Sequence, residues 1–242
     1  MTITLYDLAA ADDRVRFSPY CWRVKFALKH KRLEAREVPV RFTDKEVIAF
    51  SEQQLVPVLT DEEKIVTDSW EIAQYLETTY PDRPSLFGGA AAQAQALFIK
   101  FWCEQILHPL FLRLILQSIF TSIHVKDKAY FRKTREARFS CPLERFGVSA
   151  EQGIPPLRDA LAPVRALVQR QPFLGGQAPM FVDYMVFSHF VCARTVSPMR
   201  LIKPDDPVHG WLENMLDAFD GMARHSVRAG PVVRAVSPPD IA

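Results

Sequence analysis

The chain has 242 residues, 48% of them hydrophobic and 24% charged, which is ordinary for a globular protein. Its 30 basic and 28 acidic residues leave a net charge of +2, so the overall charge favours neither a nucleic acid nor an acidic membrane as a partner. The most apolar stretch, residues 97–123, is interrupted by Lys100, Glu104 and Arg113 and therefore predicts a buried helix, not a membrane span.

The first 80 residues alternate strand and helix signals. Apolar and β-branched runs predict strands at residues 3–6, 34–40, 55–59 and 65–66. Helices are expected to begin at Ser18-Pro19, near residues 43–44 and at Asp68-Ser69, where capping residues precede apolar positions with helical spacing. The order β-α-β-α-β-β-α requires a parallel pair of strands in the first unit, followed by an antiparallel hairpin.

The rest of the chain is predicted to be helical. Residues 81–89 are rich in Pro and Gly and indicate a linker. Helices are then expected over residues 97–120 (bent at Pro109), 129–139, 156–170, 182–195 and 207–224. We therefore predict an α/β domain over residues 1–82, a linker over 83–92 and an all-helical domain over 93–242, with only the tail from Gly230 unstructured.

Two features of the helical part are interpreted as structural. The basic segment 126–145 also carries acidic residues, so we expect a solvated helix face and not a binding patch. His189 and Cys192 lie one helical turn apart, but two ligands do not make a zinc site, so we expect core packing and no metal.

The cysteines and the N-terminus bear on the compartment. No two of the four cysteines form a C-x-x-C pair, which fits a reducing environment without disulfides (Cys21, Cys103, Cys141 and Cys192). The first residues lack the basic and apolar runs of a signal peptide, so we expect a cytoplasmic protein.

Ser18-Pro19-Tyr20-Cys21 begins the first predicted helix, where C-P-Y-C would resemble a glutaredoxin. Ser18 has no thiolate, which disfavours dithiol exchange, but its hydroxyl can donate to an anion at a helix N-terminus. If that anion is the thiolate of bound glutathione, the hydrogen bond lowers the thiol pKa. Taken alone, Ser18 is explained more simply as an N-cap. A reductase that uses Cys21 is a further alternative, but a residue one turn inside the helix is expected to be buried.

Two other places could hold a peptide-like ligand. Val56-Pro57 can form a cis peptide that exposes the backbone N–H and C=O of Val56. Asp68 suits an ammonium group, and Ser69 with the helix N-terminus suits a carboxylate; a γ-glutamyl group carries both. Each feature taken singly is explained better by a turn or a cap.

Together and in this order, these residues resemble the glutathione transferase superfamily. The similarity covers residues 3–7, 18–23, 55–59, 68–76 and 80–84. The long loop before Ser18 and the Ser-Pro-Tyr-x-Trp-Arg pattern are similar to the bacterial β-etherase-like branch and its fungal relatives. The resemblance implies a thioredoxin-like N-terminal domain, a helical C-terminal domain and a homodimer that forms across the N-terminal domain.

The resemblance also implies residue roles. Ser18 would activate the glutathione thiol, Val56 beside cis-Pro57 would bind the cysteinyl backbone, and Asp68 and Ser69 would hold the γ-glutamyl end. The partner of the glycine carboxylate should lie within residues 41–45. Tyr6 is a less favoured alternative for the catalytic residue, because it lies on the strand near which tyrosine-using classes of the family place theirs.

The helical domain matches less closely. Leu174-Gly175-Gly176 and residues 181–184 are similar to the approach to a buried helix that is normally capped by Ser, Thr or Asn three residues before an Asp. Met180 holds that cap position, so the side-chain half of the capping box is missing, at a cost of about 1 kcal/mol.

The function expected from these residues is that of a glutathione transferase. The thiolate of bound glutathione would attack an apolar, aromatic electrophile. The reaction would be either conjugation or the glutathione-dependent cleavage of aryl ethers that the branch resemblance implies. The second substrate would lie between the domains, with Phe98, Trp102 and Phe111 as candidate lining residues, although aromatic stripes on helices usually face the core. The alternative is a protein that binds glutathione and hydrophobic ligands without turnover.

Overall fold

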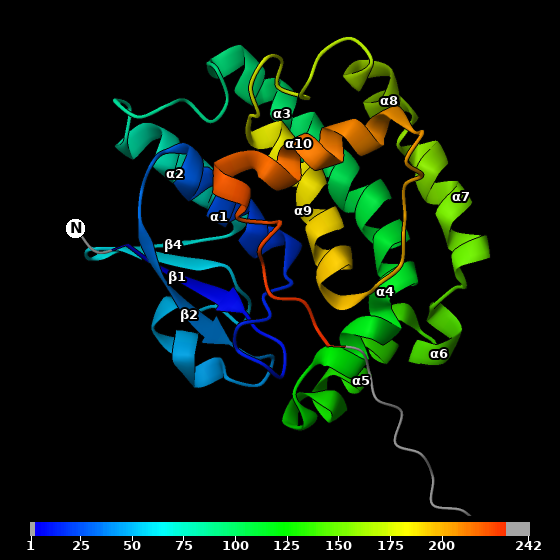
Figure 1. The fold of residues 1–242 in the computed structure, drawn as a ribbon. Coiled ribbons are helices and arrows are strands. Elements are labelled where there is room, and N and C mark those ends of the chain that lie inside the picture. The colour runs from blue at the N-terminus through cyan, green and yellow to red at the C-terminus, as the bar shows by residue number, and fades with distance from the viewer. Residues whose placement is uncertain (1–2, 231–242) are drawn as a thin grey trace, which may run out of the picture.

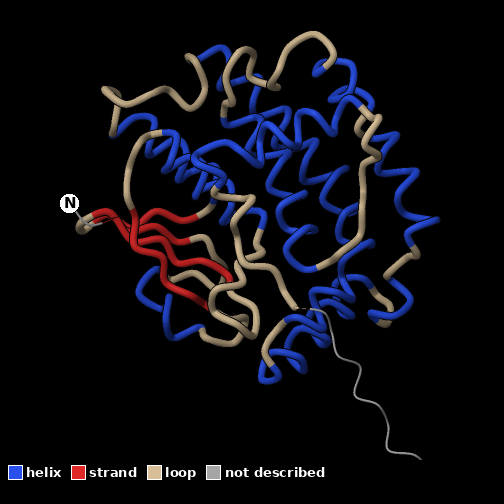
Figure 2. Tube along the Cα trace, in the orientation of Figure 1, coloured by secondary structure: helices blue, strands red, loops and turns tan. Residues whose placement is uncertain are grey.

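A computed structural model describes residues 3–230 of the chain. Its N-terminal part is built on a four-stranded mixed sheet in the order β2-β1-β3-β4 (Figures 1 and 2). The strands are β1 (Ile3–Leu8), β2 (Ala35–Val40), β3 (Val58–Asp61) and β4 (Lys64–Thr67). β1 pairs parallel with β2 and antiparallel with β3, and β3 pairs antiparallel with β4, which confirms the predicted parallel unit and hairpin.

Three helices connect and follow these strands. α1 (Pro19–His30) joins β1 to β2, the 3-10 helix η1 (Lys45–Ser51) precedes β3, and α2 (Ser69–Thr79) follows β4. The thioredoxin-like arrangement predicted for this part is thereby confirmed. α1 begins where expected, because Ser18 caps it and Pro19, which has no N–H to leave unpaired, occupies its first turn.

The described chain beyond residue 90 is helical, as predicted. Its helices are α3 (Ala90–Trp102), the π-helical turn η2 (Cys103–Leu107), α4 (His108–Ser122), α5 (Val125–Phe139), α6 (Leu143–Phe146), α7 (Ala150–Ala160), α8 (Ala162–Val168), α9 (Phe181–Val196) and α10 (Pro207–Gly221). Within residues 3–230 none of the helices combines the length and the apolar character needed to cross a membrane. Residues 231–242, which make up nearly all of the predicted tail, lie outside the described residues.

Two predicted helices differ in their course from the structure, and the helix predicted over residues 129–139 begins earlier, at Val125. The bend expected at Pro109 is replaced by the π-helical turn of η2, and Pro109 lies in the first turn of α4, where its missing N–H is tolerated. The helix predicted over residues 156–170 starts earlier, at Ala150 behind the cap residue Ser149, and breaks at Leu161. Pro163 then occupies the first turn of α8, a position that suits proline.

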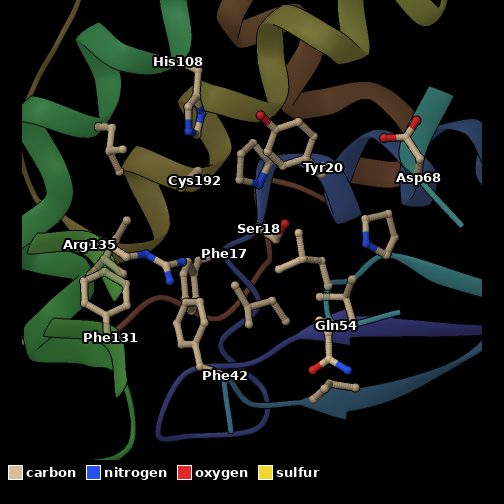
Figure 3. Close-up of a pocket in the computed structure, with 18 of the residues that line it drawn as sticks. Phe17, Ser18, Tyr20, Phe42, Gln54, Asp68, His108, Phe131, Arg135 and Cys192 are labelled. Atoms are coloured by element: carbon tan, nitrogen blue, oxygen red, sulfur yellow. The ribbon is translucent and has the colours of Figure 1, made fainter. Parts of the chain in front are cut away.

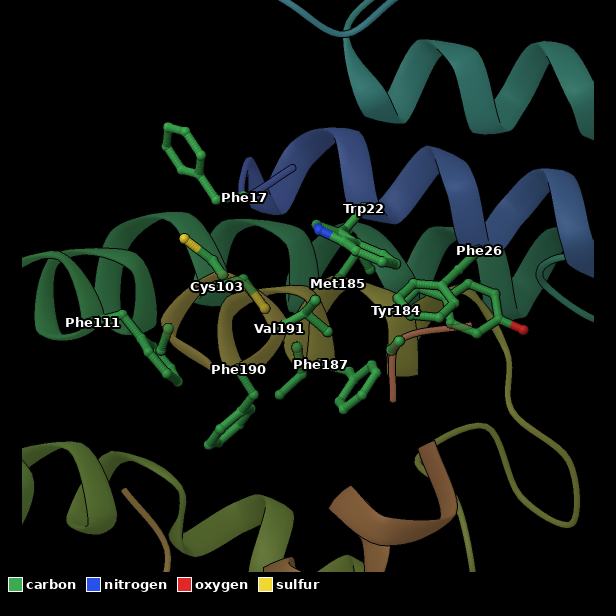
Figure 4. Packing of buried hydrophobic residues seen from close by; sticks show 14 of the residues in the cluster. Phe17, Trp22, Phe26, Cys103, Phe111, Tyr184, Met185, Phe187, Phe190 and Val191 are labelled. Carbon is green, nitrogen blue, oxygen red and sulfur yellow. The ribbon is translucent and has the colours of Figure 1, made fainter. Parts of the chain in front are cut away.

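α9 forms the centre of the helical part and packs directly on α1. Fourteen of its sixteen residues are buried, so it is covered on all sides. Phe26 of α1 lies 5.3 Å from the ring of Tyr184 and 5.5 Å from that of Phe187, measured between ring centroids (Figure 4). In Figure 1, α1 therefore runs between the sheet and α9, and one aromatic cluster joins the two parts of the chain.

The N-terminus of α9 is organised by Asp183. The fully buried carboxylate accepts hydrogen bonds from four donors, which are the backbone N–H groups of Leu174 (2.7 Å), Gly175 (2.9 Å) and Met180 (3.0 Å) and the indole N–H of Trp211 (2.9 Å). Among the described residues the side chain of Met180 makes no capping hydrogen bond, as predicted. Asp183 therefore ties the loop before α9 and helix α10 to the same point.

Removing the Asp183 charge is expected to destabilise the protein. In Asp183→Asn an amide NH₂ replaces one acceptor oxygen and faces buried donors, so we expect the free energy of unfolding to fall by about 2–4 kcal/mol. Urea denaturation followed by circular dichroism measures the change. The matched control is Asp12→Asn, since within residues 3–230 that exposed carboxylate pairs only with Arg14 and its loss should leave the midpoint unchanged. Equal midpoints for the Asp183 variant and wild type would contradict this role.

Candidate active site

A cavity of about 540 Å³ lies between the sheet domain and the helical domain. Its first wall consists of the start of α1, the segment that follows β2, the Val56–Pro57 turn and Asp68. Side chains from α4, α5 and α9 form the opposite wall, as Figure 3 shows. A ligand in this cavity would contact both domains.

Ser18 lines this cavity, and Figure 3 shows it between Arg135 of α5 and Asp68. It is 5% exposed, and its Oγ accepts a hydrogen bond from the backbone N–H of Cys21 at 3.3 Å. This cap uses a lone pair of Oγ, so the hydroxyl hydrogen remains available to donate. A donor at the positive end of a helix suits an anion in the cavity.

Two alternative catalytic residues lie outside the lining. Cys21 is fully buried, and burial raises the pKa of its thiol well above the ordinary value. An attacking thiol needs exposure and a depressed pKa, so the burial of Cys21 argues against the reductase alternative. Tyr6 lies in β1 with its ring 5.1 Å from that of Phe50, and neither it nor Cys21 is among the described residues that line the cavity.

The Val56–Pro57 peptide bond is cis, as predicted, and both residues line the cavity directly before β3. Asp68 also lines it, at the start of α2. The Asp68 carboxylate caps that helix by accepting from the N–H groups of Trp70 (2.8 Å) and Glu71 (3.3 Å). Its φ of +69° is in the left-handed region, where a non-glycine residue is strained, a feature that clusters at functional sites.

Ser69 is placed differently from Asp68. It is the first residue of α2, is 2% exposed, and is not among the residues that line the cavity in the described chain. Its position therefore supports a contact with a ligand less directly than that of its neighbour.

The segment expected to hold a glycine carboxylate brings Arg41, Phe42 and Lys45 to the cavity. Arg41 is paired, at 2.5 Å from a carboxylate oxygen of Asp13 and 3.8 Å from one of Asp44. Lys45 instead donates to the carbonyl of Gln54, and burial lowers the pKa of its ammonium. Lys45 is thus the cation of this segment that a ligand can use.

Helix α5 fixes this segment from the other domain. The buried Asp127 accepts from the backbone N–H of Thr43 at 3.0 Å and from its hydroxyl at 2.6 Å. Lys126 pairs with Asp44 beside it. The loop after β2 is therefore positioned by contacts that the helical domain supplies.

Of the three aromatic residues expected to bind a second substrate, Phe111 lines the cavity, whereas Phe98 and Trp102 do not. Phe98 is 72% exposed and Trp102 is half-buried. The reason is the phase of α3, in which Lys100 faces the cavity. Residues two positions away point about 200° around the helix and so face elsewhere.

The interpretation of segment 126–145 as a solvated face is wrong on one side of α5. Phe131, Arg135 and Arg138 line the cavity. Their spacings of four and three residues place them on one helix face, and this periodicity was the available signal. The ring centroid of Phe42 lies 5.2 Å from that of Phe131 and 6.2 Å from that of Phe17. These three rings form an aromatic wall that leads from Ser18 toward α5.

His189 and Cys192 are buried, as predicted, but they also line the cavity, together with His108. Nδ1 of His189 lies 3.0 Å from the carbonyl oxygen of Met185. Burial lowers the pKa of His108 to about 4, and the charges of Arg23 and Arg138 act in the same direction. Within residues 3–230 no three His, Cys, Asp or Glu side chains gather as metal ligands would.

Comparisons with known proteins match both domains of the chain. Residues 94–220 match the family model of the glutathione S-transferase C-terminal domain, and residues 14–84 match that of the N-terminal domain. A glutathione S-transferase-like protein of Aspergillus flavus, ustS, is 29% identical over 133 residues, which cover 49% of this chain and 47% of that protein. The match thus spans about half the length of this curated relative.

Solved structures agree with this assignment at the level of the fold. Glutathione transferase GSTFuA3 of Phanerochaete chrysosporium superposes with a TM-score of 0.76 at 24% identity, over 88% of this chain and 96% of its own. A glutathione S-transferase of Ceriporiopsis subvermispora, solved in complex with glutathione, superposes with a TM-score of 0.76 at 19% identity. The superposition covers 90% of this chain and 96% of that protein.

The imidazole of His108 is expected to stay neutral at neutral pH. Its lowered pKa of about 4 means that the folded protein binds fewer protons at this site than the unfolded chain between pH 6.5 and about 4. Its contribution to stability is therefore complete above pH 6.5 and is lost as the pH falls through that window. NMR titration of the imidazole signal, assigned with His108→Gln, measures the pKa. A midpoint near 6.5 would contradict the burial of this ring.

Proposed function

Because the chain belongs to the glutathione S-transferase family, we propose that it binds glutathione in the interdomain cavity and uses Ser18 to activate the thiol. The Ser18 hydroxyl carries this proposal. It stands at the N-terminus of α1 and faces the cavity, and Oγ caps the helix through a lone pair, so the hydroxyl can donate its hydrogen to a ligand. Donation to the thiolate favours the ionised form, which is the nucleophile.

The cavity offers a place for each part of glutathione. The cysteinyl backbone would pair with Val56 beside cis-Pro57, as an extended peptide pairs with a strand edge. The γ-glutamyl ammonium would meet Asp68, and its carboxylate the N-terminus of α2 at Ser69. Lys45 is the cation available for the glycine carboxylate.

The second substrate in this proposal is an apolar, aromatic electrophile. Phe17, Phe42, Phe111 and Phe131 supply apolar walls of the cavity. The sulfur of glutathione forms a bond to the electrophilic carbon while the bond to the leaving group breaks, and the leaving group takes the electron pair. In conjugation by substitution the leaving group is, for example, a halide; in aryl ether cleavage it is a phenolate.

Replacing Ser18 tests the role of its hydroxyl. We expect Ser18→Ala to lower kcat with an aryl or benzyl halide roughly 100-fold while glutathione binding changes little. An ultraviolet difference titration of bound glutathione should show a thiol pKa well below that of free glutathione in wild type and a higher one in the variant. Calorimetry measures glutathione affinity in both.

Ser149→Ala is the matched control. Ser149 caps α7 by accepting from the N–H of Gln152 at 3.3 Å, the same kind of bond at the same distance as that of Ser18, but away from the cavity. The Ser149→Ala variant loses a helix cap that does not contact the glutathione thiol, so its kcat should equal that of wild type. Binding without a pKa shift or turnover in wild type would favour the ligand-binding protein instead.

The homodimer is proposed through the exposed face of α3 and η2. Four large apolar side chains are exposed along this stretch, which is unusual for a surface that meets only water (Leu97, Phe98, Phe101 and Ile106). A second copy of the chain that covers these side chains would explain why Phe98, 72% exposed, faces away from the cavity.

A charge at Phe98 should disrupt that dimer. We expect wild type to sediment at twice the mass of the chain and Phe98→Glu to shift toward the monomer, because a buried unpaired carboxylate opposes association. Val125→Glu is the control, since Val125 is 75% exposed at the start of α5 and a glutamate there suits the helix N-terminus. A monomeric wild type, or a fully dimeric Phe98→Glu, would rule out this interface.

A further inference from the structure

The cavity contains a cation at its α5 end that the proposed chemistry of glutathione does not use. Arg135 lies over the face of Phe131, 4.6 Å from the ring centroid, and 5.0 Å from that of Phe42. Both aromatic residues line the cavity with it (Figure 3). The two rings hold the guanidinium in place and leave its N–H donors available to a ligand.

Arg135 is not neutralised by a carboxylate within the described part of the chain. Its one side-chain hydrogen bond there goes to the hydroxyl of Thr134 at 2.9 Å. Arg132, one turn earlier on the same helix, instead pairs with both Glu136 and Glu144 at 2.7 Å. Burial lowers the pKa of Arg135, and the charge of Arg138 adds to the effect. A half-buried cation without a counter-ion is unfavourable in the empty cavity and favours an anionic ligand.

The place of Arg135 in the cavity separates it from the proposed γ-glutamyl end of glutathione, because Arg135 and Asp68 lie on opposite sides of Ser18 in Figure 3. Lys45, proposed for the glycine carboxylate, lies closer to α5: its ammonium is 5.5 Å from the ring centroid of Tyr130, and burial together with the charge of Arg135 lowers its pKa. Lys45 donates to the carbonyl of Gln54, whereas Arg135 lies against Phe42 and Phe131, so the two cations can bind two different carboxylates. The aromatic wall from Phe17 through Phe42 to Phe131 connects Ser18 with Arg135.

We propose that Arg135 is a specificity residue that binds a carboxylate on the aromatic electrophile, so that the substrates are aromatic acids. This inference rests on the proposed transferase function. The aromatic ring of the substrate lies against Phe42 and Phe131, its carboxylate meets the guanidinium of Arg135, and its reactive carbon faces the thiolate held by Ser18. Arg138, which also lines the cavity and is not paired with a carboxylate among residues 3–230, adds to the positive field.

Two isosteric probes isolate the carboxylate, 4-(chloromethyl)benzoate and 4-(chloromethyl)benzamide. With each, the glutathione sulfur bonds to the benzylic carbon, the C–Cl bond breaks, chloride leaves with the electron pair, and the thiol proton passes to buffer. In wild type kcat/KM should be higher for the benzoate. In Arg135→Gln it should fall at least about tenfold for the benzoate and less than about twofold for the benzamide. Arg135→Lys should recover part of the benzoate preference.

Arg132→Gln is the matched control, because it removes the same charge from the same helix outside the cavity lining; both probes should react as in wild type. Equal losses for the two probes in Arg135→Gln, or a KM for glutathione raised about tenfold with both, would overturn the inference.

The proposed function can fail separately. If wild type binds glutathione but turns over neither probe, the transferase proposal is wrong, and calorimetry with 4-methylbenzoate then decides the role of Arg135. Affinity at least about tenfold weaker in Arg135→Gln would support a carboxylate site, and equal affinity would overturn it.

Discussion

The aromatic contact between α1 and α9 holds the two parts of this chain in one arrangement. Phe26 packs on Tyr184 and Phe187, and nine of the twelve residues of α1 are buried between the sheet and the helical domain. The first residue of this helix follows Ser18 directly, so the packing that stabilises the fold also fixes the hydroxyl at the domain boundary. Asp183 supports this packing, because its four hydrogen bonds hold the start of α9.

The site is shared between the domains in a specific way. The sheet domain supplies the groups assigned to glutathione, namely Ser18, Val56 and Asp68, while α4, α5 and α9 supply the opposite wall. α5 takes part in both halves. Its Asp127 holds the loop that leads to Lys45, and its Phe131 and Arg135 line the part of the cavity proposed for the second substrate. A shift of this one helix would therefore change both proposed binding regions.

The parts that could be predicted from the sequence are those set by local signals. Ser18 and Asp68 are caps, Pro57 is a turn residue, and the strand order follows from alternating apolar runs, so each was identifiable within a few residues of chain. The direction in which a helix faces depends on what packs against it. For this reason Phe98 and Trp102 were expected in the cavity, where Lys100 lies instead, and the cavity side of α5 was taken for solvent. The contact between Arg135 and the ring of Phe42 joins residues 93 positions apart, so no local pattern in the sequence could predict it.

The burial of α1 against α9 has a consequence for biosynthesis. A ribosome releases the N-terminal part first, and its sheet and first two helices are complete by Thr79. The apolar side of α1 that carries Phe26 then remains uncovered until residues 181–196 have left the exit tunnel, about a hundred residues later. During that interval the nascent chain exposes the surface on which its own central helix will pack. Messages truncated before α9 would thus yield fragments prone to aggregation, and translation speed over this stretch would influence the yield of folded protein.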